Sequence, residues 1–156
     1  MLYALAKAVH IAAVVLFLGN IITAVFWKRH ADGSHDPRII AHALAGIIRA
    51  DRWFTIPGVI MIVVAGVATA ELGHLPILGT PWILEALILF GISGAVFGIW
   101  LAPLQKQLYA LANEAAQGHD MNWERYRDLS KRWMVWGTLA TATPLAAMVI
   151  MVLKPG

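Results

Sequence analysis

Two ionisable residues lie in stretches that are otherwise apolar, and they are the first candidates for chemistry. His10 is about two turns into the first apolar stretch, and Glu85 is one turn into the third. Glu71 ends the second apolar stretch, and His74 follows three residues later. An ionisable group at membrane depth is costly and is often functional. Convergence of these four residues would create a site able to hold an ion, a cofactor or a proton.

Haem is the first chemistry that these residues suit. An imidazole in an apolar helix is a normal axial ligand of a b-type haem. His10 is the candidate ligand, and Met148 or Met151 near the end of the last apolar stretch could supply a thioether as the second. We therefore expect His10 and Met148 to be cofactor-binding residues.

A metal ion without a porphyrin is the second possibility. His10 with a methionine would suit Cu(I), whereas a set of imidazoles and carboxylates would suit a harder or borderline ion. That second set is His10, Glu71, His74 and Glu85. The third possibility is a transport path in which His10 and Glu85 change their charge.

These residues also have a purely structural interpretation. His10 would then bond to a neighbouring helix, Glu85 would reach the membrane interface, and the methionines would fill the core. Asn20, deep in the first stretch, is expected to make a hydrogen bond between helices.

The elements that must position these residues are membrane-spanning helices. The chain has 156 residues, of which 60% are hydrophobic and 13% charged, and this composition is typical of a protein embedded in a bilayer. Crossing the hydrocarbon core takes about 20 apolar residues. We expect one all-α domain over 1–156, a four-helix transmembrane bundle with spans at about 3–27, 53–71, 82–104 and 133–153.

The distribution of basic residues predicts the orientation. The connections 28–52 and 105–132 each carry five Lys or Arg residues, whereas the connection 72–81 carries none. The positive-inside rule places both long connections in the cytoplasm and both termini outside. The net charge of +3 is explained by this pattern, so nucleic acid is not an expected partner.

The long connections carry helix signals. Asp36 followed by Pro37 is typical of a helix start, Gly118 is a stop, and Asn122 is a cap for the last helix. Kinks are expected at Pro57, Pro103 and Pro144, and close internal packing is expected at Gly94 with Gly98, Gly66 with Ala70, and Gly137 with Thr141.

Several of these residues together resemble a known family. The segment from Ala50 to Gly58 reads ADRWFTIPG, and the ending from Met151 to Pro155 reads MVLKP. The other residues that carry the resemblance are His10, Gly19, Gly66, Trp82, Leu104 with Gln105, and Trp133 with Gly137. This pattern is similar to the bacterial integral membrane proteins of domain of unknown function 2269. The resemblance implies a bacterial cytoplasmic (inner) membrane protein and carries no activity.

A more distant similarity concerns His10. It resembles the first-span histidine of copper-resistance D-like membrane proteins and of HemJ-type protoporphyrinogen oxidases, which implies haem b at His10. Those oxidases also use a lysine in the third span, and 86–104 contains none. Electron transfer or porphyrin chemistry is therefore expected, without a defined enzymatic reaction.

The partners expected from the sequence are the lipid bilayer, a second copy of the chain in a homodimer or other homo-oligomer, and a quinone or another redox partner. An accessory or structural subunit is a further alternative, with the connection 106–132 docking a partner protein.

Overall fold

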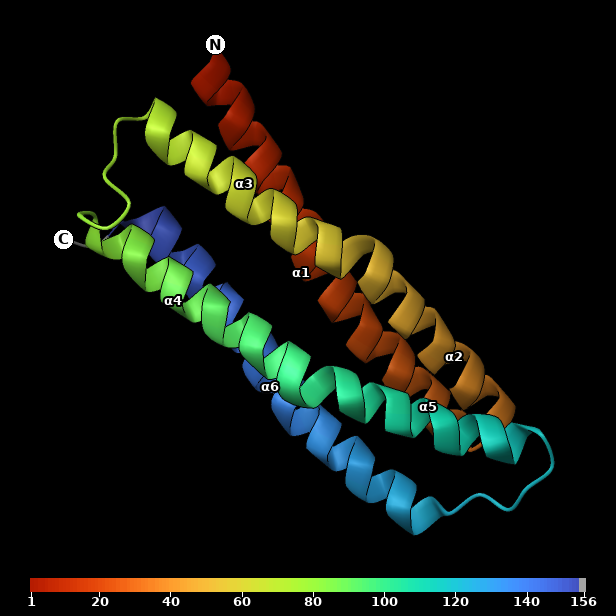
Figure 1. The fold of residues 1–156 in the computed structure, drawn as a ribbon. Helices are drawn as coiled ribbons and strands as arrows, with labels where there is room; N and C mark the ends of the chain where they lie inside the picture. The colour runs from red at the N-terminus through yellow and green to blue at the C-terminus, as the bar shows by residue number, and fades with distance from the viewer. Residues whose placement is uncertain (155–156) are drawn as a thin grey trace.

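The computed structural model describes residues 1–154, and most of them are helical (Figure 1). No strand occurs in that part of the chain, so the predicted all-α class is confirmed. The elements are α1 (Leu2–Ser34), α2 (Pro37–Ala50), the π-helical segment η1 (Asp51–Thr55), α3 (Ile56–Leu72), α4 (Pro81–Val96), the π-helical segment η2 (Phe97–Leu101), α5 (Ala102–Ala116) and α6 (Trp123–Leu153).

The helices form four long rods. The segment η1 joins α2 to α3, and η2 joins α4 to α5, so the second and third rods run from Pro37 to Leu72 and from Pro81 to Ala116. All four rods are long and apolar enough to cross a membrane. The 33 residues of α1 extend about 50 Å at about 1.5 Å per residue, well beyond a hydrocarbon core of about 30 Å. Each rod can therefore span a bilayer and project from it.

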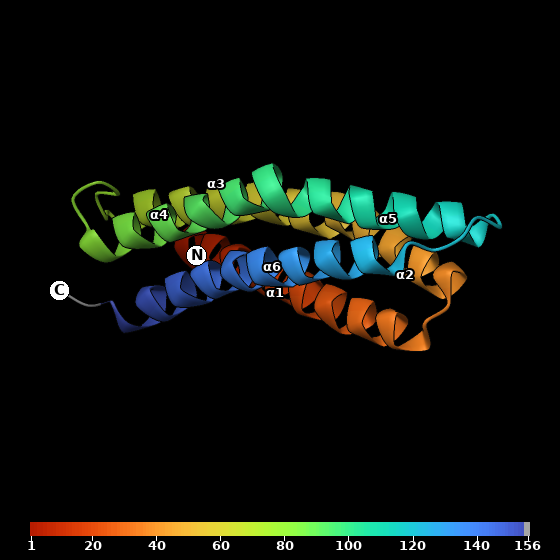
Figure 2. The same cartoon turned by 90° about the horizontal axis from the view of Figure 1, so that it is seen from below.

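The rods have two distinct ends. Both termini and the connection 73–80 lie toward one end, here called the terminal end (Figures 1 and 2). The turn at 35–36 and the loop 117–122 lie at the other, the hairpin end. The orientation predicted from the basic residues places the hairpin end in the cytoplasm.

The expected helix starts are confirmed at the hairpin end. The Asp36 side chain accepts a hydrogen bond of 2.8 Å from the backbone N–H of Arg38, one residue beyond Pro37. Asn122 accepts one of 3.0 Å from the backbone N–H of Arg125. Gly118 adopts a φ of 103° after α5 ends, a conformation that favours glycine.

Both π-helical segments lie just before prolines. A proline ring clashes with the carbonyl of the fourth residue before it, which is Trp53 for Pro57 and Ile99 for Pro103. Trp53 lies in η1 and Ile99 in η2. The wider π-helical turn gives room for each ring, and the rods continue through the prolines.

The rods pair differently at the two ends. Toward the terminal end α1 packs on α3 and α4 packs on α6, whereas toward the hairpin end α2 packs on α5. Figure 1 shows the α1/α3 pair diverging from the α4/α6 pair toward the termini. We call the region where the two pairs separate the fork.

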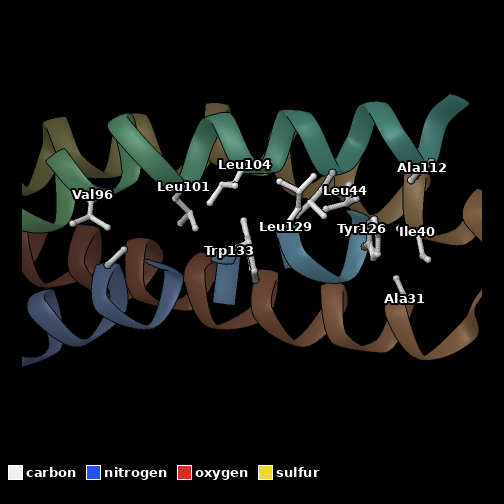
Figure 3. Close-up of a cluster of buried hydrophobic side chains, with 13 residues drawn as sticks. Ala31, Ile40, Leu44, Val96, Leu101, Leu104, Ala112, Tyr126, Leu129 and Trp133 are labelled. Carbon is white, nitrogen blue, oxygen red and sulfur yellow. The ribbon is translucent and has the colours of Figure 1, made fainter. Parts of the chain in front are cut away.

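The larger buried core lies on the hairpin side of the fork. It joins α1, α2, α5 and α6 with Val96 of α4 and Leu101 of η2. Figure 3 shows Leu101, Leu104 and Trp133 meeting in the space between the rods. A smaller cluster forms where α1 packs on α3, around Ala13, Phe17, Leu18 and Ile62.

Candidate functional site

His10 lies at the α1/α3 interface, on the terminal side of the fork. Its Nδ1 is 2.8 Å from the backbone oxygen of Ile62. Donation of the Nδ1 proton to this carbonyl fixes the ring and leaves Nε2 with a lone pair. Within residues 1–154, Nε2 makes no hydrogen bond and is not enclosed by protein. The free nitrogen is therefore available to a ligand.

Gly66 provides the space for the His10 ring. A Cβ atom at Gly66 would lie 3.0 Å from Cε1 and 3.1 Å from Nδ1 of His10. Such a distance is too short for an unstrained contact. A Cβ at Gly66 would require the imidazole to shift by a few tenths of an ångström, so the small residue expected for close packing leaves the candidate ligand its position.

The other residues predicted for the site do not gather around His10. Met148 is 40% exposed on α6, which packs on α4, whereas His10 is carried by α1. Glu71, His74 and Glu85 are all exposed near the terminal end. In the described 154 residues no three His, Asp or Glu side chains come close enough to hold a metal ion. The four-residue metal site stays a prediction, and three of its members lie on exposed faces.

A buried carboxylate that sequence reasoning did not single out lies at the fork. Asp51, at the start of η1, is 7% exposed. Its Oδ1 accepts hydrogen bonds from Thr55 Oγ1 at 2.8 Å and Asn20 Nδ2 at 3.2 Å, and its Oδ2 accepts one from Gln105 Nε2 at 3.0 Å. Asn20 also donates to Thr55 Oγ1 at 2.8 Å, so the expected interhelical bond of Asn20 is confirmed. We call these four residues the Asp51 network.

A second polar cluster lies deeper toward the hairpin end. Lys28 is 1% exposed, and its Nζ donates to Asp32 and to Ser130, both at 2.6 Å. The Tyr126 hydroxyl donates to the other oxygen of Asp32 at 2.6 Å. The sequence assigned Lys28 to the cytoplasmic connection 28–52, outside the apolar spans. It instead ties α1 to α6 inside the part of the bundle that projects beyond the spans.

Gly94 of α4 and Gly98 of η2 do not serve the internal packing that was expected of them. Nothing lies within 4 Å of a Cβ built at either glycine, so no other helix of this chain packs closely on them. Gly94 instead lines a cavity at the fork. Gly137, in contrast, packs against Leu101, as expected.

Comparison with known proteins gives one match. The family described as "Predicted integral membrane protein (DUF2269)" matches residues 4–155, nearly the whole chain. The chain belongs to this family. No curated protein and no solved structure matches it.

Membership of the family and the four long apolar rods agree that this is an integral membrane protein. The similarity to copper-resistance D-like and HemJ-type proteins finds no counterpart in these comparisons. Of the residues on which the family resemblance rested, Asp51 and Gln105 are bonded to each other and Gly66 packs on His10. Pro155, in the MVLKP ending, lies outside the described residues.

Proposed function

We propose that this integral membrane protein binds haem b through Nε2 of His10 and uses it for electron transfer or porphyrin-related redox chemistry in a bacterial cytoplasmic membrane. The observation that supports this proposal is the state of the His10 ring. One ring nitrogen is 2.8 Å from the Ile62 carbonyl, and the other makes no hydrogen bond to the described part of the chain.

This arrangement suits an axial ligand. A histidine that binds a metal usually donates its other ring N–H to a carbonyl or carboxylate, which fixes the tautomer and makes the free nitrogen more basic. The carbonyl of Ile62 takes that role here, and Gly66 leaves the ring its position. When bound, haem iron supplies one-electron redox chemistry.

A haem held by both His10 and Met148 would have to bridge the fork, because His10 lies on α1 and Met148 on α6. Met148 is the candidate thioether. Its helix stands across the fork from the α1/α3 pair. The metal set of His10, Glu71, His74 and Glu85 stays the alternative prediction, although within residues 1–154 no three of these side chains come together.

An absorption spectrum tests the proposal. The full chain is purified in detergent from haem-replete cells and measured oxidised and dithionite-reduced, together with His10→Ala and with His119→Ala. His119 is an exposed histidine of the loop 117–122, so it controls for adventitious haem on surface imidazoles. We expect a Soret band that shifts on reduction, that His10→Ala loses and that His119→Ala keeps. A featureless spectrum, or a band equal in all three proteins, would overturn the proposal.

A further inference from the structure

Two exposed basic residues flank the hydrogen bond between Asp51 and Gln105. Arg52 directly follows Asp51, and Lys106 directly follows Gln105. Each step along a helix turns the side chain by roughly a quarter of a turn. The second and third rods run in opposite directions, so one step beyond two side chains that meet turns both of their neighbours to the same outer face. We call Arg52 and Lys106 the cation pair.

The protein does not neutralise the cation pair. Neither residue forms an ion pair within residues 1–154. The segments 37–50 and 102–113, which carry this face of the bundle, contain no Asp or Glu. Asp51 points inward and accepts its hydrogen bonds from three neutral side chains. Arg49, exposed one turn before Arg52, adds a third positive charge, so the outer face is cationic.

The cation pair lies where the rods enter the bilayer. Trp53, next to Arg52, is 70% exposed, and Trp100 is exposed six residues before Lys106. Exposed tryptophans mark the boundary between hydrocarbon and water. On the hydrocarbon side of this boundary, Ile56 of α3 and Ile99 of η2 are both exposed. The surface therefore changes from cationic to apolar within about one helical turn.

This combination fits a phospholipid better than a soluble anion. The guanidinium of Arg52 can donate two parallel hydrogen bonds to a phosphate, and the ammonium of Lys106 adds a compact positive charge. A soluble phosphate compound would use the two cations and leave the exposed isoleucines without a role. A lipid uses both parts of the surface, and the bilayer that surrounds an integral membrane protein supplies it.

We propose that the cation pair binds the phosphate headgroup of an anionic phospholipid, whose acyl chains extend past Ile56 and Ile99 toward the terminal end. His10 lies on the terminal side of the fork, so this lipid site does not depend on haem.

Native mass spectrometry of the full chain in detergent tests this site, because it resolves the first bound lipid from later ones. The probes are dioleoylphosphatidylglycerol, which is anionic, and dioleoylphosphatidylcholine, which has the same chains but no net charge. We expect the first phosphatidylglycerol to bind about tenfold more tightly than the first phosphatidylcholine, since two cations act on its net charge. Glycerol 3-phosphate, which has a phosphate but no acyl chain, should not displace the lipid.

Paired variants locate the binding. Arg52→Gln with Lys106→Gln should reduce the preference for phosphatidylglycerol to about twofold or less. Arg38→Gln with Arg125→Gln is the matched control. It removes the same charge from exposed positions in the first turns of α2 and α6, far from the spans, and should keep the preference. Arg52→Lys with Lys106→Arg retains both charges and should keep most of it.

The outcomes separate a lipid site from the alternatives. Equal affinity of the parent protein for the two lipids would overturn the proposal, as would an unchanged preference after Arg52→Gln with Lys106→Gln. An equal loss in the Arg38 and Arg125 control would attribute the preference to net charge instead of this site. Displacement by glycerol 3-phosphate would assign the cation pair to a soluble phosphate compound. His10→Ala should bind phosphatidylglycerol as the parent protein does, whatever its spectrum shows.

Discussion

Gln105 donates a hydrogen bond of 3.0 Å from Nε2 to Oδ2 of Asp51, although 54 residues separate them in the chain. This bond joins the second rod to the third where the two helix pairs begin to separate. Asn20 of the first rod joins the same carboxylate, so three of the four rods meet at Asp51. The position of the fork therefore depends on a polar network inside an otherwise apolar bundle.

Loss of the Gln105 donor should destabilise the bundle. Gln105→Leu leaves Oδ2 of a buried carboxylate without a partner, and we expect the free energy of unfolding to fall by about 1–3 kcal/mol. The measurement is chemical or thermal unfolding in detergent, with the exposed neighbour Gln107→Leu as control. In an Asp51→Asn background, Gln105→Leu should lower the free energy of unfolding by less than it does in the parent protein. If the effects of the two substitutions were strictly additive, this would contradict a direct bond between the two side chains.

Gly66 and Gly19 should respond in opposite directions to alanine. A methyl group at Gly66 meets the His10 ring at 3.0 Å, whereas one at Gly19 meets nothing within 4 Å. Gly66→Ala is expected to lower the free energy of unfolding by about 1–3 kcal/mol through overpacking. Gly19→Ala is expected to raise it by up to about 1 kcal/mol through helix propensity. Equal shifts in thermal unfolding would show that the ring does not rest on Gly66.

Lys28 should matter for stability far more than other basic residues of the hairpin end. Lys28→Met removes a buried ammonium that donates hydrogen bonds to Asp32 and Ser130. The Asp32 carboxylate still accepts a hydrogen bond from the Tyr126 hydroxyl. Because the Asp32 side chain is 28% exposed, we expect the free energy of unfolding to fall by about 1–3 kcal/mol. This is less than the loss expected when a fully buried ion pair is broken. Lys131→Met, at an exposed position of the same region, should stay within about 0.5 kcal/mol. A similar effect of both substitutions would argue against the buried cluster.

Much of the fold followed from local signals in the sequence. Long stretches without charge predicted the four rods, and Asp36 with Pro37 and Asn122 predicted two helix starts, because capping depends on neighbours along the chain. The fork could not be predicted in this way, since it depends on which rods pair. Hydropathy assigned both Lys28 and Asp51 to the cytoplasmic connection 28–52. Both are buried because the rods continue to pack where they leave the apolar spans.

The candidate site was predicted only in part. The apolar surroundings of His10 identified a histidine whose ring makes a hydrogen bond to another rod. Glu71 and Glu85 were grouped with His10 because they share an end of the bundle. Which face of each helix points inward depends on how the helices pair, and the sequence does not give that pairing. A signal for the buried cluster was present in the sequence. Lys28 and Asp32 are four residues apart, and Phe17, Asn20, Ala24 and Lys28 follow each other at the three- or four-residue spacing of one helix face.

The orientation of the chain is directly measurable, because the chain has no cysteine of its own. A single cysteine at His74 marks the terminal end, and one at His119 marks the hairpin end; both positions are exposed. With both termini outside, a membrane-impermeant maleimide should label His74→Cys in intact spheroplasts and His119→Cys only after lysis. The reverse pattern would place the basic connections outside and contradict the positive-inside assignment.

The most direct test of the account is chemical rescue of the axial ligand. Removal of the imidazole in His10→Gly leaves a space that free imidazole can enter, while Ile62 and Gly66 remain unchanged. We expect that the Soret band of the parent protein is lost in this variant and returns when millimolar imidazole is added to the haem-supplied membranes. A Soret band that is unchanged in His10→Gly, or the absence of any band in the parent protein, would contradict the assignment of His10 as a haem ligand.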